Sequence, residues 1–279
     1  DRCSLKTGAR DEAFKMNEKT PALETIEMAA WGDWYRSASE ESVETFGLRV
    51  TEIAGALVTI AAKVDVLALN RVIGLGRRRP VAEGDLEEIV RLFEASGAPR
   101  FFVQVGPAAR PSHLQQMLEA RGFRHYSNWV RLERDNSPPP DVDTDLGVRE
   151  IDESHAEDFA RIVSRSFQWG ESDVHWAGDA VGRPGWRHYM AFEGETPVAT
   201  AAFFAEGKLA WFDFAATLPD HRKRGAQSAL LARRIREAMA LGCRRLTVET
   251  AQQTAEKSSP SYRNMLRFGF REIYQRPNY

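Results

Sequence analysis

The chain has 279 residues, of which 43% are hydrophobic, and its formal net charge at pH 7 is −2. This length suggests two domains or one large one, and the apolar content is sufficient for packed cores. The small net charge argues against nucleic acid as a main partner, because a phosphate-binding surface usually carries a strong basic excess. No apolar run approaches the roughly 18–20 residues that a membrane span requires, so a membrane partner is not expected.

Cysteines and histidines give no sign of a metal site. Cys3 and Cys243 are far apart and lack CxxC spacing, which argues against a disulfide framework or a zinc site and favours a reducing, cytoplasmic setting. The six histidines show no HExxH spacing, and no GxSxG turn is present. Residues 1–15 are too polar for a signal-peptide core and precede the first methionine, Met16, so we interpret them as an extension without a role.

The first half of the chain predicts helices and strands in alternation. Residues 21–36 predict a helix that begins at Pro21 after a possible Thr20 cap, with an aromatic stripe that is typical of a core. Two β-rich runs flank Ala54-Gly55 and suit paired strands. The further predictions are strands at 70–76, 100–106 and 126–132 and helices at 85–96 and 113–121. The stripe consists of Trp31, Trp34 and Tyr35.

A polar, proline-rich stretch separates the two halves. Residues 134–147 read RDNSPPPDVDTDLG and cannot continue a helical or strand period. We therefore predict a first domain at 16–135, a linker at 136–146 and a second domain at 147–279.

The second half again alternates strands and helices. A short strand at 148–151 is followed by a helix at 155–167 and an irregular segment at 168–186 that carries Trp169, Trp176 and Trp186. These tryptophans suit either binding or packing under a lid. Then follow predicted strands at 188–194, 197–207 and 209–219, a helix at 226–241, a strand at 244–250, a helix from 258 and a strand at 271–276.

Residues 222–228, RKRGAQS, lie between a predicted buried strand and an amphipathic helix. The first amides of a helix lack intrahelical partners and carry the positive end of the helix dipole, so they can hold a phosphate. Gly225 allows close approach of the backbone, and three cations precede it. This turn is a predicted anion site.

The stretch PDHRKRGAQSALL resembles the acyl-CoA pyrophosphate loop of the GNAT superfamily of N-acetyltransferases, whose pattern is Arg/Gln-x-x-Gly-x-Gly/Ala after a central strand. Arg222 and Gly225 match its first two fixed positions, whereas Gln227 departs from the third. The order of strands and helices from about residue 146 to the end is similar to that of the family domain. The resemblance implies acetyl-CoA as co-substrate, and the spacing of cysteines and histidines predicts no metal.

A short repeat extends the resemblance to the first half. MLEARGFR at 117–124 and MLRFGFR at 265–271 both place Gly-Phe-Arg between a helix and a final strand. The first half lacks the loop pattern, however, and places acids at the start of its helix, where they would repel a diphosphate. These acids are Glu83, Asp85, Glu87 and Glu88. The expected fold is α+β, with two tandem GNAT-like domains, each a mixed, mostly antiparallel sheet flanked by helices, the first having lost cofactor binding.

The resemblance also assigns cofactor contacts. The strand before the loop is expected to splay, so that the backbone of Ala215, Ala216 and Thr217 pairs with the pantetheine arm and the Thr217 amide faces the thioester carbonyl. His221 beside the loop is interpreted as incidental. Asn264 is expected to bond either the pantetheine or the loop. The residues expected to bind the diphosphate are Arg222, Lys223, Arg224, Gly225, Ala226, Gln227 and Ser228.

Transfer of an acetyl group to an amine requires a group that takes up the amine proton, because a free alkylamine has a pKa of about 10. Asp213 and Glu249, one on each of the strands that should splay apart, are the candidate bases, or else salt-bridged structural acids. Many family members carry a tyrosine as the acid for the thiolate where this chain has Met265; Tyr262 is the nearest phenol.

These observations predict an N-acetyltransferase that moves an acetyl group from acetyl-CoA directly to a primary amine. A cationic small molecule such as an aminoglycoside or polyamine is a suitable acceptor, and a peptide N-terminus or a lysine fits the same chemistry. A non-catalytic CoA-binding or interaction module is the alternative, and a different acyl donor is a third possibility. The first half would supply structure and part of the acceptor wall, in a monomer or homodimer.

Overall fold

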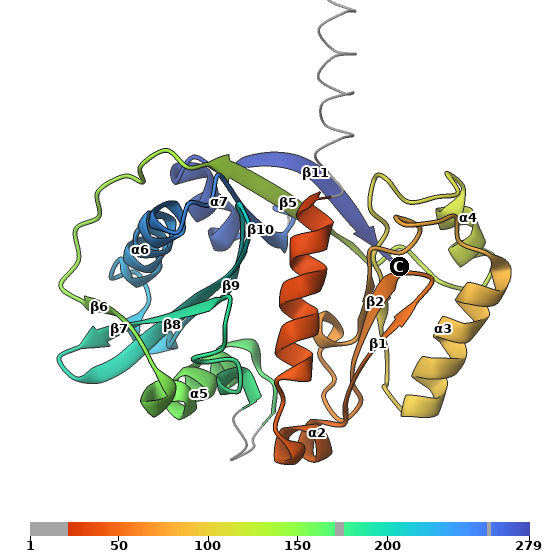
Figure 1. Ribbon diagram of the computed structural model, residues 1–279, viewed down its shortest axis with the longest axis horizontal. Helices are drawn as coiled ribbons and strands as arrows, with labels where there is room; N and C mark the ends of the chain where they lie inside the picture. Colours follow the sequence, from red (N-terminus) through yellow and green to blue (C-terminus); the bar gives the residue numbers. More distant parts are fainter. Residues whose placement is uncertain (1–21, 171–175, 256–257) are drawn as a thin grey trace, which may run out of the picture.

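The structure is a computed structural model that describes residues 22–170, 176–255 and 258–279. The predicted extension at 1–15 and the predicted Thr20 cap with Pro21 lie outside the described residues. The described residues form two sheets, one of four strands and one of seven, flanked by helices (Figure 1). The expected α+β class with two tandem halves is confirmed.

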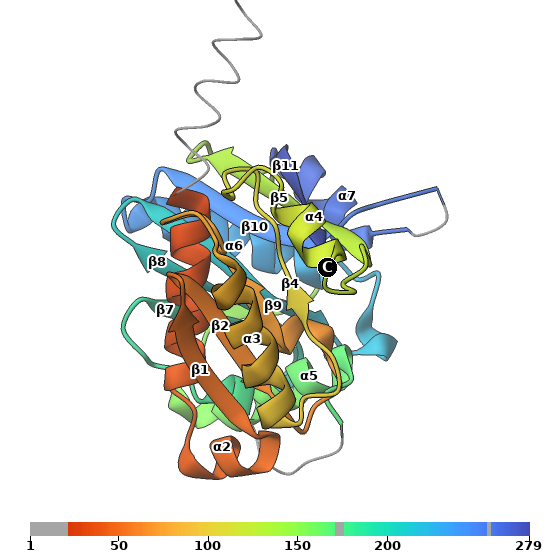
Figure 2. The same ribbon diagram turned by 90° about the vertical axis from the view of Figure 1, so that its right-hand side faces the viewer.

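The first half forms the four-stranded sheet, in the order β1-β2-β3-β4. β1 to β3 are antiparallel, and β4 runs parallel to β3. Figure 2 shows α3 lying over the outer face of this sheet. The elements are a helix described from 22 to 36, α2 (Glu40–Phe46), β1 (Leu48–Ile53), β2 (Ala56–Ala61), a 3₁₀ turn (Leu67–Leu69), β3 (Arg71–Ile73), α3 (Glu83–Ser96), β4 (Phe102–Val103) and α4 (Leu114–Glu119).

The sequence analysis predicted each of these elements except α2 and the 3₁₀ turn. α2 is only seven residues long, too short for a clear periodicity, but its ends carry ordinary signals. The Ser39 side chain accepts a hydrogen bond from the Ser42 N–H, and Gly47 ends the helix at a φ of 64°. α2 positions the start of β1.

The second half supplies most of the seven-stranded sheet, whose order is β11-β5-β10-β9-β8-β7-β6. α6 packs on one face against β8, and α5 packs on the other against β9. The elements are β6 (Gly147–Glu150), α5 (Ala156–Phe167), β7 (Trp186–Glu193), β8 (Thr196–Glu206), β9 (Leu209–Thr217), α6 (Ala226–Ala240), β10 (Arg245–Ala251), α7 (Pro260–Arg267) and β11 (Arg271–Asn278), with 3₁₀ turns at Glu153–His155, Trp176–Gly178 and Pro219–His221.

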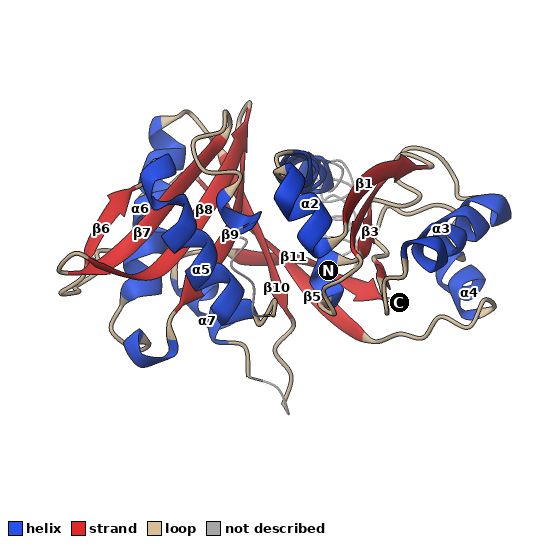
Figure 3. Cartoon of the chain, turned by 90° about the horizontal axis from the view of Figure 1, so that it is seen from below, coloured by secondary structure: helices blue, strands red, loops and turns tan. Residues whose placement is uncertain are grey.

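The two halves exchange their last strands. β5 (Ser127–Asp135), the final strand of the first half, lies between β10 and β11 in the sheet of the second half. The end of β11 reaches the first half in return, where Val103 and Tyr279 exchange backbone hydrogen bonds of 2.9 and 3.0 Å. Figure 3 shows β5 and β11 running between the halves. The sequence analysis expected β5 at the end of the first domain; its pairing partners are instead strands of the second.

The repeated Gly-Phe motif has the same backbone structure in both halves. Gly122 and Gly269 have φ of 84° and 80°. In each case the N–H of the following phenylalanine bonds a carbonyl of the preceding helix, Phe123 to Leu118 at 3.2 Å and Phe270 to Met265 at 3.1 Å. A left-handed residue at this point ends a helix and satisfies its last carbonyls. The repeat is therefore structural, not a chance match.

A continuous aromatic core joins the halves. Trp34, on the helix that stands between the two sheets (Figure 1), stacks on Trp176 with ring centroids 4.1 Å apart and meets Phe214 of β9 edge-on at 4.9 Å. Trp169 lies 5.6 Å from both Trp34 and Trp176. The aromatic stripe and the three tryptophans of segment 168–186 are buried, so the packing interpretation holds for the stripe and for the described part of that segment.

Candidate active site

The central feature of the second sheet is a fork between β9 and β10. These strands pair in parallel from Leu209 and Arg245 to Phe212 and Val248, and the pairing ends there, although β9 continues to Thr217 and β10 to Ala251. Asp213 and Glu249 are thus the first residues beyond the last pair, one on each arm. The predicted splaying of these strands is present.

A β-bulge shapes the β9 arm. The pairing of β8 with β9 shifts register between Thr200 and Ala202, and Phe214 opposite this shift has a φ of 51°. Positive φ is strained for a bulky residue, and a bulge re-aims the backbone that follows.

Beyond the bulge, alternate peptide groups face the fork. The Leu218 N–H donates to the Val198 carbonyl of β8 at 3.0 Å. Because the peptide groups of an antiparallel strand alternate in direction, those of Ala216 also face β8, and those of Ala215 and Thr217 face the fork. The Arg222 Nε donates to the Thr217 carbonyl at 3.3 Å, from the open side. Two of the three predicted pantetheine contacts therefore present backbone groups to the fork.

The turn between β9 and α6 leads directly from the fork into a helix start. Gly225 precedes α6 with a φ of 82°. A Cβ at this position would lie 3.3 Å from the Asp143 carbonyl oxygen and from Thr144, so the linker packs closely behind the turn. The Thr144 hydroxyl donates to the Arg224 carbonyl at 2.9 Å. The amides of the first turn of α6 are consequently held in place by the chain around them.

Gln227, which departs from the family pattern, turns away from these amides. Its Nε2 donates to the carbonyls of Ala216 at 2.7 Å and Thr200 at 3.2 Å and to the Thr217 hydroxyl at 3.0 Å. The side chain thus ties the first turn of α6 to β8 and β9. It adds no bulk over the turn, so the departure is compatible with phosphate binding there.

The cations of the turn divide into two groups. Arg222 and Lys223 are exposed. Arg224 is held by ion pairs to Asp145 and to Glu193, the latter at 2.6 Å, and Glu193 also lies 3.1 Å from His221. The exposed pair is therefore the better source of charge for an anion.

Ser228 and Asn264 connect α6 to α7. The Ser228 hydroxyl donates to the Asn264 Oδ1 at 3.3 Å, and Arg267 donates to both side chains at 3.1 and 2.6 Å. Asn264 therefore contacts Ser228, the last residue of the turn at 222–228, and a bond from Asn264 to the pantetheine stays a prediction.

Asp213 lies at the base of the fork, and its residue surface is of intermediate exposure. Its oxygens accept hydrogen bonds from the Trp211 indole and from the Phe214 N–H, each at 2.8 Å. Burial raises the pKa of Asp213 although these two donors and the charge of Arg71 lower it. A raised pKa makes this carboxylate a stronger proton acceptor than an ordinary aspartate.

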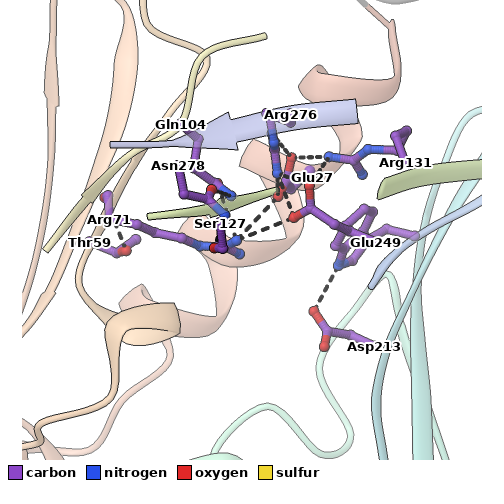
Figure 4. Close-up of polar contacts among 11 residues, drawn as sticks. Glu27, Thr59, Arg71, Gln104, Ser127, Arg131, Asp213, Glu249, Arg276 and Asn278 are labelled. Atoms are coloured by element: carbon purple, nitrogen blue, oxygen red, sulfur yellow. Dashed lines mark hydrogen bonds and ion pairs between the residues drawn. The ribbon is translucent and has the colours of Figure 1, made fainter. Parts of the chain in front are cut away.

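Glu249, across the fork, belongs to a buried ionic cluster, which we define as Glu27, Arg71, Arg131, Glu249 and Arg276 (Figure 4). Its carboxylate lies 2.5 Å from Arg276, 3.5 Å from Arg71 and 3.8 Å from Arg131. Its side chain is only 3% exposed. The salt-bridged structural interpretation of Glu249 is thus the one that its contacts support.

Tyr262 is not brought to the fork. Its hydroxyl bonds Glu272 of β11 at 3.2 Å, and β11 is separated from β9 by β5 and β10. Burial and the Glu272 carboxylate raise the pKa of Tyr262. Met265, in the position of the family tyrosine, is buried in the core.

The described residues offer neither a metal-binding group nor a membrane-spanning helix. No group of three or more histidines, cysteines and acids there is arranged to hold a metal ion. Within the same residues, no helix is long and apolar enough to cross a membrane.

The forked central strand pair, the bulge and the glycine-led helix start all lie in the second half of the chain. Residues 148–270 match the model of the acetyltransferase (GNAT) family, so this chain carries a GNAT acetyltransferase domain. The match to this family supports acetyl transfer from acetyl-CoA as the reaction of the domain. A search of curated proteins finds no match.

The fold of the whole chain is that of a tandem GNAT protein. It is similar to a tandem GNAT protein from the clavulanic acid biosynthesis pathway, with 17% identity, a TM-score of 0.53 and coverage of 80% of this chain and 76% of the other. A GCN5-related N-acetyltransferase from Kribbella flavida gives 14% identity, a TM-score of 0.62 and coverage of 93% and 94%. A GCN5-related N-acetyltransferase from Sphaerobacter thermophilus gives 16% identity and a TM-score of 0.57, and the match covers 86% of this chain and 84% of the other.

Proposed function

We propose that this protein transfers an acetyl group from acetyl-CoA directly to a primary amine of a small molecule. The observation that carries the proposal is the position of the fork immediately before the turn at 222–228. With the diphosphate on the first amides of α6, a pantetheine arm lying along Thr217 and Ala215 would end beside Asp213. The acetyl group would then lie between the bulged backbone and a carboxylate.

Asp213 is the proposed base. Attack on the thioester requires a neutral amine, and the carboxylate that accepts the proton must lie within reach of the nucleophile. The backbone N–H of Thr217, turned toward the fork, is proposed to stabilise the negative charge that develops on the carbonyl oxygen. Because Tyr262 bonds Glu272 instead, water is the proposed proton source for the leaving thiolate, which is a weak base.

Calorimetric titration of acetyl-CoA tests the binding step. We expect one site per chain, lost in a double variant with Arg222→Ala and Gly225→Glu. Arg78→Ala is the matched control, because it removes a cation from the corresponding basic turn ahead of α3. Binding at two equal sites would mean that the first half retains cofactor binding, and absence of binding by the intact protein would contradict the proposal.

A CoA-binding module without catalysis is the second candidate. It is favoured by the ion pairs of Glu249 and by the hydrogen bond of Tyr262 to Glu272, because these contacts leave Asp213 as the only proposed base and no proposed acid among the three predicted catalytic residues. Thiol release from acetyl-CoA with a panel of polyamines and aminoglycosides separates the candidates. Turnover that Asp213→Asn abolishes, with CoA affinity retained, supports the enzyme; binding without turnover for any amine supports the module.

A further inference from the structure

Arg234 of α6 is a buried cation directly behind the fork. Its residue surface is 1% exposed, and none of the described carboxylates lies within ion-pair distance of it. Its hydrogen bonds go to carbonyl groups, those of Ala202 at 3.0 Å, Asp213 at 3.3 Å and Leu230 at 3.4 Å. Burial lowers the pKa of Arg234 to about 9, so the guanidinium remains charged at neutral pH. An unpaired charge in such a place is costly and calls for a specific reason.

The contacts of Arg234 lie on the bulge itself. Ala202 and Asp213 are the paired residues at which the register of β8 and β9 shifts. The guanidinium thus bonds the carbonyls of both strands at this point. It also lies 4.8 Å from the Phe212 ring centroid, which completes its apolar surroundings.

One peptide group links Arg234 to the carboxylate at the fork. In a trans peptide the C=O and the N–H point in opposite directions. The carbonyl of Asp213 points to Arg234, and the N–H of the same peptide, which belongs to Phe214, donates to the Asp213 Oδ1 at 2.8 Å. The bulged peptide therefore lies between a cation on the α6 side and a carboxylate on the fork side. A cation at the carbonyl polarises the N–H and strengthens its bond to the carboxylate.

We propose that Arg234 is a positioning residue for Asp213: it holds the bulged peptide in the orientation that aims the Phe214 N–H at the carboxylate, and through its charge it keeps that carboxylate ionised. The use of Asp213 as a base rests on the proposed function. The link between Arg234 and the ionisation of Asp213 does not.

Other charges also face Asp213. Arg71 of β3 favours its ionised form, and Glu27 of the helix at 22–36 opposes it. Both belong to the ionic cluster, where Arg71 also faces Glu249 of β10. The charges of Arg71 and Glu27 act in opposite directions on Asp213. Arg234 lies outside this cluster, so its effect can be tested without disturbing the cluster.

The experiment follows the ionisation of Asp213 through Trp211, whose indole N–H donates to the carboxylate. The pH titration of that indole signal is recorded by ¹H–¹⁵N NMR, with the signal assigned by Trp211→Phe. Removal of a nearby cation disfavours the carboxylate, so Arg234→Met should raise the midpoint by about one pH unit or more. Arg234→Gln, which removes the charge but can still donate to a carbonyl, should raise it in the same direction and serves if the methionine variant does not fold.

Arg233→Met is the matched control. It removes the same charge from the next residue of α6, where the side chain is 41% exposed and pairs with Glu237 at 2.8 Å. Its midpoint should equal that of the wild type. A midpoint that stays unchanged in the Arg234→Met and Arg234→Gln variants would overturn the proposal.

The pH dependence of acetyl transfer tests the same link independently of the NMR titration. If Asp213 is the base, the acid limb of kcat/KM moves to higher pH in Arg234→Gln by the same amount as the NMR midpoint. A shifted NMR midpoint in a protein that turns over none of the amines would reject the proposed function and leave the assignment of Arg234 intact.

Discussion

Replacement of Glu27 by glutamine should destabilise the protein much more than the same replacement of Glu24, the other buried acid on the helix at 22–36. Glu27 is fully buried and accepts hydrogen bonds from Arg276 at 2.8 and 2.7 Å; it also bonds Arg131 and lies 3.6 Å from Arg71. Glu27→Gln removes one of the two carboxylates among the three arginines of the cluster. Breaking a buried ion pair by removing one partner costs about 3–5 kcal/mol, because the remaining charge is left uncompensated. We expect a loss of that size in the free energy of unfolding.

Glu24, three residues earlier on the same helix, is the control. Burial raises the pKa of Glu24, although Arg276 opposes the shift, and the Glu24 Oε1 has no partner among the described residues. Burial disfavours the charge of Glu24, so conversion to a neutral amide should cost less there than at Glu27, whose charge the arginines favour. Glu24→Gln should therefore change stability at pH 7 by less than about 1 kcal/mol.

The pH dependence of the Glu27 effect follows from its pKa. Burial alone would raise this pKa, but Arg131 and Arg276 hold it well below its usual value of 4.5. A lowered folded-state pKa contributes stability that is present above the unfolded value and is lost as the pH falls toward the folded value. The difference between wild type and Glu27→Gln should thus shrink in acid.

Urea unfolding followed by circular dichroism measures all three proteins at several pH values. The reasoning would be refuted if Glu27→Gln came within 1 kcal/mol of the wild type at pH 7, or if Glu24→Gln lost as much.

Further substitutions test the fork and the core between the halves. Asp213→Asn should lower kcat by about 10²-fold or more, the usual contribution of a general base, with the acetyl-CoA dissociation constant unchanged by calorimetry. Gln227→Ala removes hydrogen bonds between α6 and β9 worth about 1 kcal/mol, so the KM for acetyl-CoA should rise roughly fivefold; an unchanged KM would contradict this role. Trp34→Ala should lower the free energy of unfolding in urea by about 3–5 kcal/mol. Tyr126→Ala should lower it by less than about 0.5 kcal/mol, because Tyr126 is 64% exposed.

Local sequence signals predicted most of the fold. Glycine-led turns, apolar alternation and the repeated Gly-Phe motif gave the order of elements in both halves, and the loop pattern located the fork and the start of α6. Two other features were not predictable in this way. α2 has no periodicity to detect, and the partners of β5 depend on contacts far apart in the chain. A strand with the same alternation can pair in either sheet.

The catalytic residues were harder to predict than the loop. Asp213 and Glu249 occupy equivalent places on the two arms of the fork, and the sequence could not separate them. The difference arises from Arg276, Arg131 and Arg71, which meet Glu249 only in the folded chain. An arginine on the apolar face of a helix, as at Arg234 in LLARRIRE, is the signal that was available. A charge on the buried face of a helix indicates either a partner or a function.

The strand exchange brings the first half, which lacks the loop pattern, into contact with the fork of the second half. β5 covers the edge of β10 over its whole length, from Arg245 opposite Asp135 to Ala251 opposite Trp129. β5 also carries Arg131 into the cluster that binds Glu249. Without it, β10 would be an exposed edge strand, and one arm of the fork would lose the pairing that sets its direction. The first half thus contributes to the second by holding the fork open, with β5 and the helix at 22–36 as the contacts that do so.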